Sequence, residues 1–130
     1  MWHEYLDNNI FIRMIYKNVP ELEKIDIYEV VVSHNGPLIK IGFDLPRFAD
    51  FPPKKWDQTH NTVRMTLEFF GSEELAWEGW STHNVGSISI KQEKSGRYSV
   101  IVKTDEMKIS FTSSSYFTQD VHGTFREDRI

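Results

Sequence analysis

Two stretches of strict alternation set the fold class, Ile39-Lys40-Ile41-Gly42-Phe43-Asp44-Leu45 and Val63-Arg64-Met65-Thr66-Leu67-Glu68-Phe69. In both, every second residue is apolar and the residues between are polar or small. Because successive side chains of a β-strand point to opposite faces, this period predicts two strands, each with one buried and one solvated face. A sheet of this kind covers its apolar face by folding over as a sandwich or by curling into a partly closed barrel, and the pattern is compatible with both.

The same period extends outward in both directions from these stretches. Upstream, Ile25–Val32 alternates except near Tyr28, where the parity changes, and this indicates a β-bulge. Downstream, turn residues such as Ser95-Gly96 and Asp105-Glu106 separate further apolar segments. We therefore expect about eight antiparallel strands in a meander of mostly sequential order. Their approximate ranges are 25–32, 39–45, 63–69, 75–80, 85–92, 98–104, 107–113 and 116–125.

The composition also favours a mostly-β (α+β) protein. The chain holds twelve Ile and nine Val but only six Leu and two Ala, and β-branched residues pack well in sheets and lose rotamer freedom in helices. The helical signal is confined to the N-terminus. Asn8 and Asn9 are good N-cap residues, and apolar residues four apart precede Pro20, which ends a helix. This predicts a short helix over about Asn9–Lys17, with a further helical turn in Trp2–Asp7.

Length, charge and cysteine content exclude several classes of protein. A chain of 130 residues forms one domain, which we place over residues 1–130. Its formal net charge of −4 disfavours general binding to nucleic acid or anionic membranes. The lack of cysteine rules out disulfides and thiolate metal sites and favours the reducing cytoplasm. We find neither a signal-peptide pattern nor an apolar run near the roughly 18 residues of a membrane span, so we expect a soluble cytoplasmic protein.

The residues that carry catalysis or bind metals are not arranged for either task. None of the five histidines stands at a chelating spacing from another. The Ser113-Ser114-Ser115 run lacks the G-x-S-x-G elbow of serine hydrolases, and the glycines are too scattered for a phosphate-binding loop. Glu68 and Glu78 could form a carboxylate pair, but such pairs arise by chance on exposed sheet faces. We therefore predict no metal, no other cofactor and no enzymatic activity.

A long connection from Asp44 to His60 interrupts the meander. It contains several prolines and four large apolar residues, Leu45, Phe48, Phe51 and Trp56. Connections of more than about 12–15 residues are usually functional or disordered, and this apolar content argues against disorder. Two interpretations remain open: a plug that covers one end of the core, and a binding loop with Trp56 and the preceding lysines at its tip.

The clearest charge asymmetry lies between Met65 and Ile90. This segment has no Lys or Arg and four acids, Glu68, Glu73, Glu74 and Glu78. If a hairpin at Gly71-Ser72 paired Leu67 with Trp77, Glu68 and Glu78 would share the solvated face with Trp80 and form an acidic patch. That arrangement depends on the register of the pairing.

In that register, an exposed tryptophan would lie beside carboxylates, as in binding hot spots for basic proteins. We therefore take Glu68, Glu73, Glu74, Glu78 and Trp80 as candidate partner-binding residues. The alternative is a solvated, charged sheet face on which Trp80 stacks over Arg64.

One string in the long connection is unusual. Residues 44–56 read D-L-P-x-F-x-D-x-P-P-x-K-W, with Ile15-Tyr16 and Val19-Pro20-Glu21-Leu22 before it and Gly79-Trp80 after it. Together these features resemble the immunity protein 50 family of bacterial polymorphic toxin systems. The resemblance extends from about Asn9 to Phe125.

The resemblance implies a cytoplasmic antidote that binds a cognate toxin and blocks it without catalysis. It transfers no toxin-contact residues to this chain, and the residues of the 44–56 string are as compatible with holding the fold as with touching the toxin. Many toxins of such systems attack nucleic acids and have basic surfaces, so a basic nuclease is the toxin class that an acidic patch would suit.

A second class of function stays open beside the antidote. A small-molecule or carbohydrate-binding β domain would stack its ligand on Trp56 or Trp80 inside a cleft. The oligomeric state is also open between a monomer and a homodimer formed through an edge strand.

Overall fold

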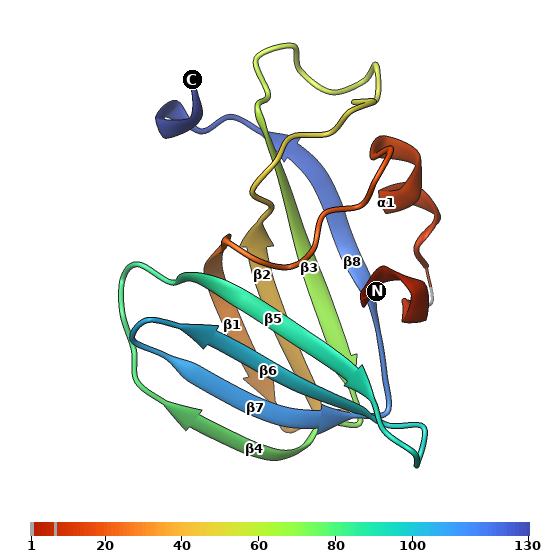
Figure 1. Ribbon diagram of the computed structural model, residues 1–130, viewed down its shortest axis with the longest axis vertical. Helices are drawn as coiled ribbons and strands as arrows, with labels where there is room; N and C mark the ends of the chain where they lie inside the picture. Colours follow the sequence, from red (N-terminus) through yellow and green to blue (C-terminus); the bar gives the residue numbers. More distant parts are fainter. Residues whose placement is uncertain (1, 7) are drawn as a thin grey trace.

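The computed structural model describes residues 2–6 and 8–130, and β-sheet dominates their regular secondary structure (Figure 1). The elements are η1 (Trp2–Tyr5), α1 (Ile10–Ile15), β1 (Ile25–Ser33), β2 (Leu38–Asp44), β3 (Thr62–Phe70), β4 (Glu73–Glu78), β5 (Val85–Gln92), β6 (Tyr98–Thr104), β7 (Lys108–Ser113), β8 (Ser115–Thr124) and η2 (Glu127–Arg129). The expected mostly-β class, with antiparallel strands and a short N-terminal helix, is confirmed.

The α-helix is shorter than the sequence predicts. It begins after Asn9, whose side chain makes no capping hydrogen bond, and it ends at Ile15. Tyr16 leaves the helix in an extended conformation because its buried side chain donates a hydrogen bond to the backbone of Arg47. The expected turn in Trp2–Asp7 is a 3-10 helix over Trp2–Tyr5, and Asp7 lies outside the described residues.

All eight strands belong to one sheet in the order β4-β7-β6-β5-β1-β2-β3-β8. The expected sequential order holds within two meanders, β1-β2-β3 and β5-β6-β7. Three neighbours come from distant parts of the chain: β5 lies beside β1, β8 beside β3 and β4 beside β7. The predicted bulge in β1 is confirmed, since the register shifts between Ile27 and Glu29.

The sheet folds over on itself because the two meanders meet along a very short seam. β1 and β5 pair only at Ile25 with Gly86 and Asp26 with Val85. Beyond that seam β5, β6, β7 and β4 cross in front of the other half (Figure 1). Aromatic rings join the facing halves, with Phe69 of β3 5.1 Å from Phe111 of β7. The edge strands β4 and β8 do not pair, so the sheet is not closed into a barrel.

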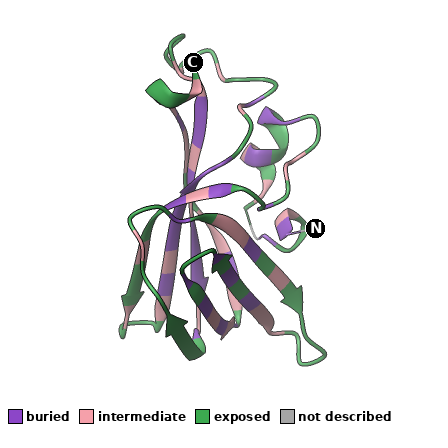
Figure 2. Cartoon of the chain, turned by 60° about the vertical axis from the view of Figure 1, so that its left-hand side comes forward, coloured by how far each residue is buried: buried purple, intermediate pink, exposed green. Residues whose placement is uncertain are grey.

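The apolar residues of the two alternating stretches, residues 39–45 and 63–69, belong to the core. Ile39, Ile41, Phe43 and Leu45 are 0–2% exposed, and the four apolar residues from Val63 to Phe69 are completely buried. The alternation of burial along the strands is visible in Figure 2. The N-terminal helices add Trp2, Ile12 and Ile15 to the same cluster.

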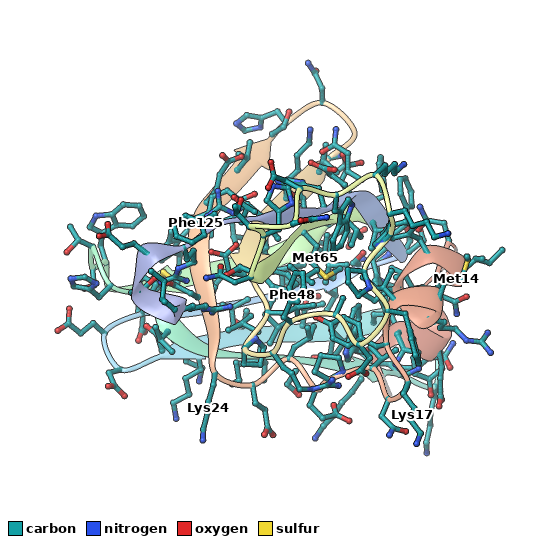
Figure 3. The ribbon with its side chains drawn as sticks, turned by 90° about the horizontal axis from the view of Figure 1, so that it is seen from above. Met14, Lys17, Lys24, Phe48, Met65 and Phe125 are labelled. Atoms are coloured by element: carbon teal, nitrogen blue, oxygen red, sulfur yellow. The ribbon has the colours of Figure 1, made fainter. Side chains whose placement is uncertain are left out.

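The connection between β2 and β3 covers one end of this core. Leu45 and Ala49 are buried, and Phe48 and Trp56 pack against the cluster. In the view from above, Phe48 and Met65 both project onto the centre of the molecule, whereas Met14 and Lys17 lie at the periphery (Figure 3). Phe51 is 59% exposed, so the connection acts as a plug through most, but not all, of its large apolar residues.

Candidate partner-binding surface

Strand β4 is a free edge of the sheet and every one of its residues is exposed. It is coloured as exposed along its whole length in Figure 2. It pairs with β7 alone, from Glu73 opposite Thr112 to Glu78 opposite Lys108. The register shifts between Glu73 and Ala76, where Glu74 has a φ of 57°. An edge strand presents unpaired backbone groups to solvent, which makes it a natural place for contact with another chain.

The three glutamates and the tryptophan of β4, together with the tryptophan just beyond the strand, form a surface that we call the acidic edge: Glu73, Glu74, Glu78, Trp77 and Trp80. Glu73 lies 3.9 Å from Arg97, and Glu78 stands opposite Lys108 in the β-ladder. Glu74 makes no ion pair with any described residue. The acidic edge therefore keeps at least one uncompensated carboxylate at the bulge.

The two tryptophans lie side by side at the end of β4. Their ring centroids are 6.1 Å apart, and the Trp77 indole N–H donates to the carbonyl of Gly79 at 3.0 Å. Trp77 is 36% exposed and Trp80 is 72% exposed. Large side chains exposed to this degree are characteristic of surfaces that bind a partner.

Gly79 places Trp80 outside the sheet. Its φ is +83°, and a Cβ atom there would lie 1.9 Å from the carbonyl oxygen of Glu106. Only glycine adopts this conformation at so close an approach. The chain can therefore leave β4 directly against the β6–β7 turn and project the indole of Trp80 into solvent.

The hairpin expected between the strands around Gly71-Ser72 is wrong, because β3 pairs with β8 and β4 pairs with β7. Aromatic packing accompanies the pairing that forms: Phe70 of β3 stacks on Phe117 of β8 with ring centroids 4.6 Å apart. Two of the sequence-based expectations change as a result.

The first change concerns Glu68, which is not part of the acidic edge. It lies inside β3, is 7% exposed and pairs with Lys40 at 3.5 Å. The second concerns Arg64, which stacks over the ring of Tyr28 at 4.6 Å rather than over Trp80. Of the candidate residues, the structure thus groups Glu73, Glu74, Glu78 and Trp80 on one edge.

The role of Trp77 was missed in the sequence. The alternating pattern assigns it to the buried face, and it does stand opposite the buried Ile109. Because β4 is an edge strand, however, no strand of the described residues lies beyond it to cover the ring of Trp77. In the sequence, the feature that indicates an exposed strand here is the segment from Met65 to Ile90, which has four glutamates and no Lys or Arg.

Trp56 is placed differently from Trp80. Its ring contacts Phe11 and Phe48, with centroids 6.2 and 6.1 Å away, and it approaches Gly123 so closely that a Cβ there would lie 2.7 Å from the indole. This packing assigns Trp56 to the plug over the core. Trp56 also lines a pocket of about 380 Å³, and Trp80 lines another of about 340 Å³, so a ligand-stacking function could use either ring.

The unusual string at 44–56 also has a structural role. Asp44 is 3% exposed and accepts hydrogen bonds from Arg64 at 2.7 and 3.1 Å and from Arg126 at 3.2 Å. The bonds to Asp44 raise the pKa of the Arg64 guanidinium. Asp50 binds Arg47 and the backbone N–H of Lys17. The string thus holds the plug against the sheet and against the segment after α1.

No group of three or more histidine and acidic side chains is close enough to hold a metal ion in residues 2–6 and 8–130. No helix in the same part of the chain is both long and apolar enough to cross a membrane.

An open antiparallel sheet with an acidic edge and two exposed tryptophans is typical of a β-sheet protein that binds other proteins. The chain matches the model of the family described as immunity protein 50 over residues 8–122, and it belongs to that family. The resemblance read from the 44–56 string is therefore confirmed. Comparisons with curated proteins and with solved structures find no match.

Proposed function

We propose that this protein neutralises a cognate bacterial toxin by binding it through the acidic edge, without catalysis. Membership of the family supports the first half of this proposal, and the exposure of Trp80 on the same edge of the sheet as Glu74 and Glu78 supports the second. Trp80 would act as the aromatic anchor, and the glutamates would steer a basic surface toward it. A basic nuclease is the toxin class that this charge favours, and the cytoplasm of the producing cell is the compartment where protection is needed.

The charged residues of β4 also argue against pairing of this strand with β4 of a second copy of the chain. If two β4 strands paired antiparallel about their midpoint, Glu73 of each copy would face Glu78 of the other. Like charges directly opposite one another destabilise a ladder, and charged residues on edge strands prevent such pairing. We therefore propose that β4 is free of self-association and available to the toxin.

Co-expression tests the function itself. The toxin domain encoded beside this gene would be produced with the tagged chain, and the pair would be passed over a sizing column. We expect a stable complex, and survival only of cells that make both proteins. A toxin that stays lethal and elutes separately would contradict the proposal.

Charge reversal tests the surface. We expect the double variant Glu74→Lys, Glu78→Lys to associate with the toxin about tenfold more slowly at low ionic strength, because steering by exposed charges acts mainly on the association rate. Surface plasmon resonance at low and high salt would measure both rate constants. The matched control is Glu21→Lys, Glu23→Lys, which makes the same change in net charge at exposed residues outside the acidic edge. Equal association rates for the two double variants at low salt would rule out the acidic edge as the steering surface.

A further inference from the structure

A pocket opens beside Trp80, between β1 and the connection from β4 to β5. It has a volume of about 340 Å³, and its lining includes Asp26, Tyr28, Glu29, Trp80, Ser81 and Asn84. The pocket exists because β1 pairs with β5 only at Ile25 and Asp26, so the two halves of the sheet diverge immediately beyond that seam. It is continuous with the acidic edge through Trp80.

The lining is rich in hydrogen-bond acceptors and aromatic rings. Its charged residues are Asp26 and Glu29, and the described residues that line it include no Lys, Arg or His. Asp26 is paired with Arg126 at 2.8 Å, whereas Glu29 is exposed and makes no ion pair with a described residue. The pocket therefore carries an uncompensated negative charge.

The nearest cations do not cancel this charge. Arg64 and Arg126 are shared among three aspartates, Asp26, Asp44 and Asp128. Arg129 also acts on Asp128, so three positive charges balance these three negative ones, and the uncompensated charge of the pocket is that of Glu29.

Asn84 gives a second and independent indication. It is 8% exposed and is fixed at two points: its backbone carbonyl accepts from the N–H of Ile27 at 2.9 Å, and its side-chain Nδ2 donates to the carbonyl of Ser81 at 2.6 Å. The remaining polar atom of the side chain, Oδ1, is buried and accepts no hydrogen bond from any described residue. Since buried acceptors nearly always have a donor, this amide oxygen lacks a partner that a bound group would supply.

We propose that this pocket receives a basic side chain, an arginine that the toxin presents to the acidic edge. A guanidinium combines a positive charge, five N–H donors and a planar surface that stacks on aromatic rings, which matches the carboxylate, the free amide oxygen and the indole found here. The chain already uses this chemistry nearby, where Arg64 lies over Tyr28 and binds Asp44 with two hydrogen bonds. The proposal rests on the proposed function for the source of the arginine, but not for the chemistry of the pocket.

The pocket can be tested without the toxin. The probe is N-acetyl-arginine amide, titrated into the 15N-labelled protein, and N-acetyl-citrulline amide is the matched control of the same shape without the charge. We expect saturable shifts of the Trp80 indole N–H and the Asn84 side-chain amide with arginine, at least tenfold weaker binding of citrulline, and no shift of the buried Trp2 indole. Equal binding of the two probes, or no movement of the Trp80 and Asn84 signals with arginine, would overturn the proposal.

The toxin complex then separates this proposal from the function. We expect Trp80→Ala and Glu29→Gln each to weaken toxin binding at least tenfold, and Trp80→Phe to restore part of the loss, with Glu23→Gln as the charge control. All substituted side chains are exposed, so the variants should fold, as thermal melting would check. Unchanged affinity in both variants would reject the pocket and leave the function standing. If arginine binds but no toxin complex forms, the function fails and the pocket stands.

Discussion

Replacing Asp44 by alanine is expected to lower the free energy of unfolding by about 3 kcal/mol. Asp44 is almost completely buried and is bound to two guanidinium groups, those of Arg64 and Arg126. Removing one partner of a buried ion pair costs about 3–5 kcal/mol because the other charge loses its compensation. We take the lower end of this range since the side chains of Arg64 and Arg126 are 32% and 21% exposed and can recover some hydration.

Urea unfolding followed by circular dichroism would measure this loss, and Asp50→Ala is the control. Asp50 also belongs to the 44–56 string and also binds an arginine, Arg47, but it is exposed. Exposed ion pairs contribute only about 0–1 kcal/mol, so the control should remain near the stability of the wild type. Similar losses in the two variants would mean that burial of Asp44 is not what makes the string structurally important.

Gly79→Ala is expected to cost about 3 kcal/mol of stability and to weaken toxin binding as well. The positive φ alone costs about 1–2 kcal/mol for a residue with a Cβ atom. The clash with the carbonyl of Glu106 adds a further cost of about 1–3 kcal/mol, since the β6–β7 turn must move away. Because the same backbone carries Trp80 and accepts the bond from Trp77, the acidic edge should change shape together with the fold.

The variant Gly96→Ala separates the cost of the positive φ from the cost of the clash. Gly96 has a similar φ of +89°, but a Cβ atom there would meet no heavy atom within 4 Å. We therefore expect this variant to lose only about 1 kcal/mol, the cost of backbone strain, and to bind the toxin normally. If the two variants were equally stable in urea, close contact with the β6–β7 turn could not be the reason for glycine at position 79.

The residues that stabilise the fold and the candidate contact residues lie on different parts of the molecule. Most of the 44–56 string, including Trp56 and Asp44, holds the plug on the core. The candidate contact residues lie instead on β4 and just beyond it, where the sheet ends and few described residues restrain them. Substitutions on such an edge change the surface with little effect on the core, which suits the toxin-binding function that we propose.

Local pattern predicted the strands well, because the direction of a side chain in a strand follows from its position alone. Ile39–Leu45 and Val63–Phe69 needed only their alternation to be assigned as strands with one buried face. The bulge near Tyr28 could be read in the same way, from the change of parity. The helix end was less predictable, because it depends on a hydrogen bond between Tyr16 and Arg47, which are far apart in the chain.

The sequence by itself therefore determined which residues form strands, which face of each is apolar and to which family the chain belongs. Only the tertiary structure decided which strands from distant parts of the chain are neighbours. Backbone hydrogen bonding is the same for any two strands, so the choice of β8 over β4 as the partner of β3 rests on packing between distant residues such as Phe70 and Phe117. That choice buried Glu68, left β4 as a free edge, and, with the short seam between β1 and β5, opened the pocket beside Trp80.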